Sequence, residues 1–366
     1  MSVLTAFETL GPTDRDAFAA ADALAETVFP KAEALGEDGD AQVRDAAKAA
    51  GLFDLAQRAA PEALLTLTVV RERLAASGAR CRKAALGPSP GLLQNASGAL
   101  QARFAEPVAQ GLRRQAFAFT DDATAPVHAT PAEGGYRLRG RKSFVTGGLA
   151  ADHFMVYAQS DAGPLMLIVE EGTAGMTRAD PFETLDGGQH CALVFDDAFV
   201  PEAHRLGEAG QGKAQAFTQI NRTRLMLASE AVGLMAYAVH RAAEHLQAPR
   251  SKGPCLGDQE GPQLRFAELW MPVFAARALL YRVATQFAQG EGTPEGLAAL
   301  KVHTSEAAEH VLSRALQLCG AHALRADDPL ARSYREVRSW QFAEGASDLL
   351  RLRIAKARLA KGRGAL

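Results

Sequence analysis

The stretch Tyr136-Arg137-Leu138-Arg139-Gly140 alternates between apolar and polar side chains. A period of two residues is typical of a β-strand that buries one face. Three short apolar runs follow it, with glycines between them: Phe154-Met155-Val156-Tyr157, Leu165-Met166-Leu167-Ile168-Val169 and Cys191-Ala192-Leu193-Val194-Phe195. Runs of this length between turn residues predict strands. We therefore expect an antiparallel β-domain over residues 113–211.

The regions on both sides of this β-domain show a helical period. Before it, alanine is frequent and apolar residues recur at i, i+3 and i+4. After Gly210-Gln211-Gly212 the same period returns and continues in long segments with short breaks, a pattern typical of a four-helix bundle. The predicted fold is mainly α with a central β-domain. It comprises an N-terminal α-helical domain over 1–112, the β-domain, and a C-terminal four-helix bundle over 212–366.

Composition excludes several classes of protein. Of 366 residues, 48% are hydrophobic and 22% are charged, which is the balance of a globular chain. The net charge of −2 gives no electrostatic reason to bind nucleic acid. We expect no membrane span, because no apolar run approaches the roughly 20 residues required. Met1 to Leu10 carry an acid and no cation, so we expect no targeting peptide and a cytoplasmic location.

The cysteines give no sign of a metal site. There are four, and none has the spacing of a Cys-x-x-Cys or Cys/His zinc motif. Free thiols in a reducing compartment are therefore expected, and no bound metal.

A possible catalytic group lies near the C-terminus, in the segment Phe342-Ala343-Glu344-Gly345-Ala346-Ser347. The segment falls in a break between two amphipathic helices. A carboxylate there can lie in an apolar crevice, where its pKa rises towards that of a useful general base. Gly345 allows the backbone to pass close to a bound ligand. Taken alone, the segment is more typical of a helix end with a solvated glutamate.

The surroundings of Glu344 resemble a known family. The segment from Tyr334-Arg335-Glu336-Val337-Arg338 to Arg351 is similar to the YRD…YEGT…R segment of flavin-dependent acyl-CoA dehydrogenases. The resemblance runs from about residue 110 to the C-terminus and is loose over the first hundred residues. In that family the Glu of EGT removes the α-proton of an acyl thioester, which implies that Glu344 is the catalytic base. The family's other base position is occupied here by Thr223.

The resemblance also implies FAD as the cofactor. The segment Arg141–Gly147 resembles the family's G.K.WITN motif, where an aromatic ring lies against the isoalloxazine and a hydroxyl bonds its N5 edge. The segment Ala315–His322 resembles the Q.hGG.G motif, which serves the pyrophosphate of FAD held mainly by a neighbouring subunit. The cofactor-binding residues implied in this way are Phe119, Thr120, Phe144, Thr146, Arg250, Gln317, Gly320, Ala321 and Ala346.

The implied substrate-binding residues are Arg224, Ala343 and Gly345. Arg224 belongs to an R…AVG motif whose Gly233, inside a predicted helix, implies close packing on another element. Ala343 stands where the family often has Tyr, which would leave room for a branched or bulky acyl group. Two further departures are alanines in place of glycines of the Q.hGG.G motif, at Ala321 and Ala323. Ala346 replaces the Thr of EGT, and Phe-Gly is absent after Arg250.

The expected function is FAD-dependent α,β-dehydrogenation of an acyl thioester to the trans-2-enoyl thioester, with flavin N5 as hydride acceptor, as part of lipid metabolism. The implied substrate is acyl-CoA or an acyl-carrier-bound acyl group. The implied partners are an electron-transfer flavoprotein and further copies of the chain, in a homodimer or homotetramer. Two alternatives stay open: a subunit of a heteromeric dehydrogenase with partial or no activity alone, and a flavin oxidase or monooxygenase of the same fold. The glycine replacements favour the heteromeric subunit, whereas Glu344 argues against both alternatives.

Overall fold

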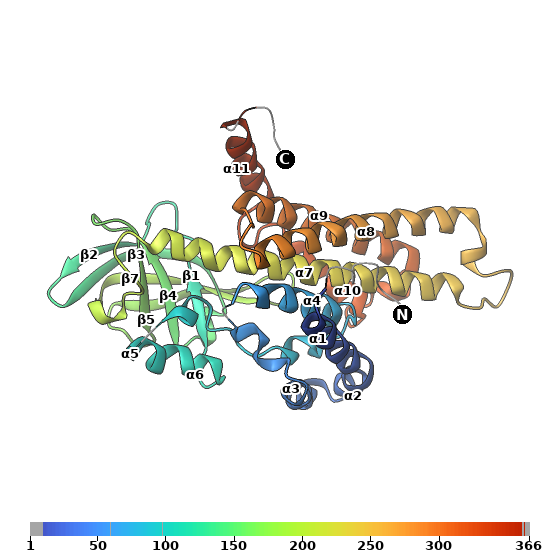
Figure 1. Ribbon diagram of the computed structural model, residues 1–366, viewed down its shortest axis with the longest axis horizontal. Coiled ribbons are helices and arrows are strands. Elements are labelled where there is room, and N and C mark those ends of the chain that lie inside the picture. The colour runs from blue at the N-terminus through green and yellow to red at the C-terminus, as the bar shows by residue number, and fades with distance from the viewer. Residues whose placement is uncertain (1–9, 59, 97, 361, 363–366) are drawn as a thin grey trace. The chain divides into compact units, whose positions relative to one another are not determined.

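The computed structural model describes residues 10–58, 60–96, 98–360 and 362, which form helices and two β-sheets (Figure 1). They fall into two compact units. The helical unit takes its described residues from Met1–Gly87 and Asn221–Leu366, and the β unit is Pro88–Ile220. The division into three domains stays a prediction. Residues 1–9 of the chain lie outside the described residues. They make up most of the segment in which no targeting peptide was expected.

The helical unit is built from long helices joined by short connections. Its helices are α1 (Pro12–Ala23), α2 (Phe29–Ala34), α3 (Gly39–Ala49), α4 (Glu62–Ala75), α8 (Glu260–Ala288), α9 (Pro294–Cys319), α10 (Pro329–Ser339), α11 (Ser347–Ala360) and, from Asn221 onwards, α7 (Gly212–Gln247). Helix α8 packs against α4 and α9, and α9 packs against α10 and α11 (Figure 1). Leucine, alanine and valine side chains from these helices form one continuous core.

Gly233 brings two of these helices into close contact. A Cβ atom added at this residue of α7 would lie 2.3 Å from the carbonyl oxygen of Glu72 and 2.6 Å from the Cβ of Ala75, both on α4. Real side chains do not approach so closely, so only glycine permits this spacing. The prediction of close packing at Gly233 is confirmed.

The β unit contains two sheets and two short helices, α5 (Gly98–Leu100) and α6 (Glu106–Ala109). Its strands are β1 (Gln115–Ala118), β2 (His128–Ala132), β3 (Gly135–Thr146), β4 (His153–Ala158), β5 (Leu165–Glu170), β6 (Met176–Glu183) and β7 (Gln189–Pro201). One sheet has the order β1-β4-β5 and the other β2-β3-β7-β6. Alternate residues of both sheets, among them Leu138, Val156 and Leu193, are buried in a shared core.

The prediction of a purely antiparallel β-domain needs one correction. The four-stranded sheet and the β4–β5 pair are antiparallel. Strand β1, however, pairs with β4 in parallel, with Gln115 opposite His153. A parallel pair needs a long connection, and here β2 and β3 supply it. The rest of the predicted class, mainly helical with a β-domain, is confirmed.

A bulge in β3 decides which way its last residues face. Lys142 lies opposite Leu193, but Val145 lies opposite Cys191, so β3 has one more residue than β7 between these pairs. Lys142 and Val145 are consequently both fully buried, although they are three residues apart. Phe144, between them, faces outward and is 45% exposed.

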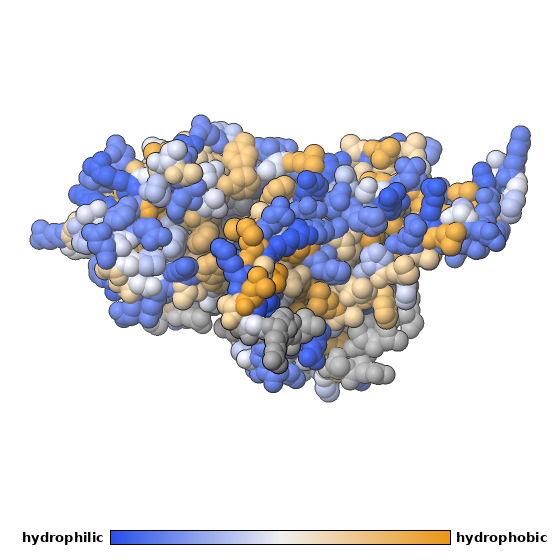
Figure 2. Space-filling model, turned by 90° about the horizontal axis from the view of Figure 1, so that it is seen from above, coloured by the Kyte–Doolittle hydropathy of each residue, from blue (hydrophilic) through white to orange (hydrophobic). Residues whose placement is uncertain are grey.

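Hydrophilic residues predominate on the face shown in Figure 2, with hydrophobic residues gathered in several small groups. Among the helices that the structure describes, none is both long enough and apolar enough to cross a membrane.

Candidate functional site

Glu344 lies in the connection between α10 and α11, in a backbone conformation that is unusual for its residue type. Its φ is +56°, and that of the following Gly345 is +104°. Positive φ places a side chain against its own backbone, so a glutamate adopts it only where the surroundings hold it there. One such hold is local, because the Ser347 N–H donates to the Gln341 carbonyl at 2.9 Å and closes the turn.

Arg224 on α7 holds the turn from one side. Its Nε and Nη2 donate to the carbonyl oxygen of Glu344 at 3.0 and 2.8 Å, and its Nη1 donates to Asn221 Oδ1 at 3.0 Å. The residue is only 3% exposed. The arginine predicted to bind substrate therefore directs its guanidinium at the backbone of the Glu344 turn, and a direct contact with substrate stays a prediction.

Lys301 on α9 holds the same turn from another side. Its ammonium donates to the carbonyls of Gln341 at 3.0 Å and Gly345 at 2.8 Å. Lys301, which is 1% exposed, was not among the predicted site residues. A signal was present, because Lys301 interrupts the apolar stripe of a helix whose neighbouring positions Leu297, Leu300 and Thr304 are also buried. A lysine is rarely placed there unless it has partners.

The carboxyl of Glu344 is tuned by its environment. The residue as a whole is half-buried, yet burial raises the pKa of its carboxyl to about 7, against the opposing effect of Arg224 and Lys301. Within the described part of the chain, its carboxylate has no hydrogen-bond or ion-pair partner. The N–H of Glu344 likewise meets no acceptor among the described residues. The turn thus offers the Glu344 carboxyl as a base that is half ionised near pH 7. The backbone N–H of the same residue lies beside it as a hydrogen-bond donor.

In the β unit, the exposed ring of Phe144 contacts the half-buried Phe182 and the buried His190. Its centroid lies 4.4 Å from that of His190 and 5.1 Å from that of Phe182. The hydroxyl of Thr184 lies 3.1 Å from Nε2 of His190, whereas Nδ1 of His190 is buried without a partner in the described chain. Thr146, two residues beyond Phe144, is exposed at the end of β3. A flat apolar surface beside a free hydroxyl fits a planar heteroaromatic ligand.

Phe119 and Thr120 follow strand β1 and are fixed by the buried Lys142. The Lys142 ammonium donates to the Phe119 carbonyl at 3.0 Å and pairs with Asp121 at 2.7 Å. Phe119 is half-buried and its ring stacks on Phe117, with centroids 5.8 Å apart. Thr120 is exposed, and its carbonyl accepts from the backbone of β3.

The remaining predicted residues lie in two places. Ala343 and Ala346 are half-buried in the Glu344 turn, with Gly345 between them. Gln317, Gly320 and Ala321 are exposed at the C-terminal end of α9, and Arg250 is exposed in the loop after α7.

The α9 end is remote from the Glu344 turn within one chain. Sixteen residues separate Lys301, which contacts the turn, from Gln317, and at 1.5 Å per residue this is about 24 Å of helix. The structure therefore brings the catalytic segment together with Arg224 but does not bring the Gln317 segment to it.

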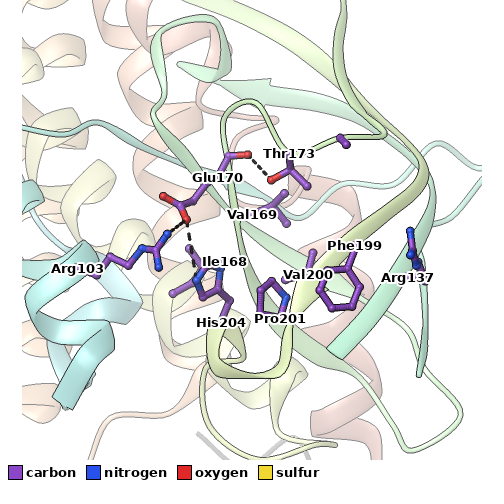
Figure 3. A pocket seen from close by; sticks show the side chains of 11 residues that line it. Arg103, Arg137, Ile168, Val169, Glu170, Thr173, Phe199, Val200, Pro201 and His204 are labelled. Carbon is purple, nitrogen blue, oxygen red and sulfur yellow. Dashed lines mark hydrogen bonds and ion pairs between the residues drawn. The ribbon is translucent and has the colours of Figure 1, made fainter. Parts of the chain in front are cut away.

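A pocket of about 420 Å³ lies elsewhere in the β unit (Figure 3). Figure 3 shows Arg103 and His204 directed at the carboxylate of Glu170, and the Thr173 hydroxyl donating to the Glu170 carbonyl. Arg137, on the opposite side, is paired with Asp197. The charged groups of the pocket are thus paired with one another or with nearby side chains. Among the described residues, none of those predicted for the site lines this pocket.

Comparison with known proteins gives consistent matches. Residues 210–359 match the family model "Acyl-CoA dehydrogenase, C-terminal domain". The chain is 30% identical to the acyl-CoA dehydrogenase of Bacillus subtilis (strain 168) over 262 residues, which are 68% of this chain and 69% of the relative. It is 29% identical to the mitochondrial isovaleryl-CoA dehydrogenase of Solanum tuberosum over 61% of this chain and 56% of the relative. The match therefore spans less than two thirds of that relative's length.

The fold has close counterparts among solved structures. One is a glutaryl-CoA dehydrogenase from Mycobacterium smegmatis in complex with FADH2, with a TM-score of 0.82 at 17% identity, covering 99% of this chain and 98% of the other. At this identity the likeness concerns the fold alone.

Proposed function

Because the chain belongs to the acyl-CoA dehydrogenase family, we propose that it oxidises an acyl thioester to the trans-2-enoyl thioester. One observation carries the proposal. Glu344 lies in a strained turn whose backbone carbonyls accept hydrogen bonds from Arg224 and Lys301, and burial raises the pKa of its carboxyl to about 7. A base for a weakly acidic C–H bond works best when its pKa lies near the working pH.

The residues of the turn divide the chemistry between them. The Glu344 carboxylate takes the α-proton of the acyl group, and the electrons of that C–H bond form the new double bond as the β-hydride departs. The N–H of Glu344 donates to the thioester oxygen as negative charge develops there. FAD, when bound, supplies the acceptor for the β-hydride. Ala343, a small residue beside the base, leaves room for a branched or bulky acyl group.

The β unit supplies one set of contacts to FAD. The ring of Phe144 would contact the isoalloxazine of FAD, and the Thr146 hydroxyl would hydrogen-bond to it. Support comes from the exposure of both residues and from the rings of Phe182 and His190 that hold Phe144 in place. The glutaryl-CoA dehydrogenase with the same fold was solved with FADH2.

A second copy of the chain supplies the Gln317 segment. That segment lies about 24 Å along α9 from Lys301, and it is exposed at the helix end, with Gly320 at a φ of +76°. The segment is therefore placed to contact a partner's FAD pyrophosphate rather than the site of its own chain. Trp270 and Phe274 on α8 are exposed, and their rings stack with centroids 5.1 Å apart, which suits an interface in the homodimer or homotetramer.

An electron-transfer flavoprotein reoxidises the flavin.

Anaerobic stopped-flow reduction of the bound flavin tests the function. Short, branched and aryl acyl-CoA thioesters are offered to the wild type, to Glu344→Gln and to Asp348→Asn, an exposed carboxylate close to the turn. We expect at least one thioester to reduce the wild-type flavin, and Glu344→Gln to be slower by about 10²–10⁴-fold. Asp348→Asn should match the wild type.

Two results would contradict the proposal. Equal rates for Glu344→Gln and wild type would place the base elsewhere. A protein that binds no flavin, or whose flavin no thioester reduces, would favour the alternative of a subunit that needs a different partner chain.

A further inference from the structure

Lys301 is a buried cation that donates two hydrogen bonds, both to backbone carbonyls. Its ammonium bonds the carbonyls of Gln341 and Gly345, which lie on the two sides of Glu344. We propose that Lys301 is a positioning residue: its ammonium holds the Glu344 turn in the catalytic conformation, and the turn loosens when Lys301 loses its proton. The inference rests on the proposed function only for the role that it gives to Glu344.

The geometry explains why the charge is needed. Glu344 and Gly345 both have positive φ, at +56° and +104°, and such a conformation costs free energy unless it is held from outside. Charge-assisted hydrogen bonds are about twice as strong as neutral ones. A neutral amine at Lys301 would keep weak contacts with the two carbonyls but lose most of this hold. The turn would then keep the bonds from Arg224 to the single carbonyl of Glu344 and the local backbone bond from Ser347 to Gln341.

The environment of Lys301 makes this loss accessible at moderate pH. Burial and the nearby Arg224 lower the pKa of Lys301 to about 8, while Glu344 and Glu306 act in the opposite direction. These are the charged groups that face the ammonium from α7, from the turn and from its own helix. The working form therefore combines an ionised Glu344 with a protonated Lys301. Because each charge favours the other, the two titrations are coupled.

A tryptophan beside the turn provides a test that needs neither flavin nor substrate. The chain has two tryptophans. Trp340 is 6% exposed and directly precedes Gln341, whereas Trp270 is 49% exposed. In a Trp270→Phe background, the emission of Trp340 reports on the turn alone. We expect it to change between pH 7 and 9 with a midpoint near 8. The change should vanish in Lys301→Met, and it should be absent up to pH 10 in Lys301→Arg, which keeps its charge.

The pH profile of flavin reduction gives a second, independent test. In the wild type we expect a bell-shaped dependence of the flavin reduction rate on pH. Its acidic limb follows the ionisation of Glu344, and its alkaline limb follows the loss of the proton from Lys301. Lys301→Met should move the acidic limb to higher pH, since a positive charge near Glu344 is gone. It should also lower the reduction rate at pH 8 by about 10²-fold, with little change in substrate affinity. Lys301→Arg should restore most of the rate.

Thr304→Val is the matched control. Thr304 is equally buried on α9, and its hydroxyl donates to the Leu300 carbonyl of the same helix. It should behave as the wild type in both tests. The proposal is overturned if the Trp340 transition persists in Lys301→Met, if the wild type shows none, or if Lys301→Met slows the reaction equally at every pH. If no thioester reduces the flavin, the proposed function fails, and the fluorescence result still decides the role of Lys301.

Discussion

The guanidinium of Arg224 donates two hydrogen bonds, of 3.0 and 2.8 Å, to the backbone carbonyl of Glu344, 120 residues further along the chain. Two parallel N–H groups on one oxygen fix the direction of that peptide plane as well as its position. The peptide is the one that joins Glu344 to Gly345, where φ is positive on both sides. The conformation of the proposed base thus depends on a helix far from it in sequence.

Replacement of Glu344 by Gln is expected to stabilise the protein above neutral pH. The unfolded carboxyl ionises near its usual pKa of 4.5, whereas the folded one holds its proton up to about 7. Below pH 4.5 both states are protonated, and the two proteins should differ little. As the pH rises from 4.5 to about 7, the unfolded carboxyl ionises while the folded one keeps its proton, so the wild type loses stability, at most about 3 kcal/mol by linkage.

Urea unfolding of both proteins between pH 4 and 9 measures this difference. The gap should open between pH 4.5 and 7 in favour of Glu344→Gln. A gap that does not depend on pH would show that the carboxyl ionises normally in the folded protein.

Replacement of Gly345 by Ala should strain the turn. Its φ of +104° disfavours any side chain, and the added Cβ would lie 3.3 Å from Nη2 of Arg224 and from Leu350 Cδ2. We expect a loss of about 1–3 kcal/mol in unfolding free energy, together with slower flavin reduction. Gly290→Ala, at a φ of +76° in open space, is the control for backbone strain alone. If both variants lose a similar amount of unfolding free energy and reduce flavin as fast as the wild type, the crowding at Gly345 has no effect.

Replacement of Gly233 by Ala should force α7 and α4 apart. The new methyl group would meet the Glu72 carbonyl at 2.3 Å and Ala75 at 2.6 Å. Overpacking of this kind costs about 1–3 kcal/mol or more. In contrast, Gly261→Ala, on α8 with open space around it, should gain up to about 1 kcal/mol from helix propensity. Thermal unfolding of both variants separates the two effects, and a stabilised Gly233→Ala would disprove the close contact.

Replacement of Phe144 by Leu should weaken the binding of FAD. The variant keeps an apolar side chain on Phe182 and His190 but removes the flat exposed ring. We expect the dissociation constant of FAD for the apoprotein to rise about 10-fold, with unfolding free energy little changed. Calorimetric titration measures the affinity. Leu149→Ala, at another exposed apolar residue of the β unit, is the control and should bind FAD normally.

Periodicity predicted the fold class because it records which face of each element is buried. The alternation around Leu138 and the apolar runs that became β4, β5 and β7 gave the β-domain. The parallel pairing of β1 with β4 was missed, since period two is the same in both kinds of ladder. The outward turn of Phe144 was also beyond this reasoning, because it depends on a bulge that is defined only by the partner strand β7.

Local pattern and residue type are enough to place the helical and β regions, the break before α11 and the residue proposed as the base. The state of that base depends instead on how the helices pack. The pKa of Glu344 and the shape of its turn come from Arg224 on α7 and Lys301 on α9. These groups lie 120 and 43 residues away, and no spacing rule connects them. Burial, donor geometry and electrostatic balance arise only when the helices pack.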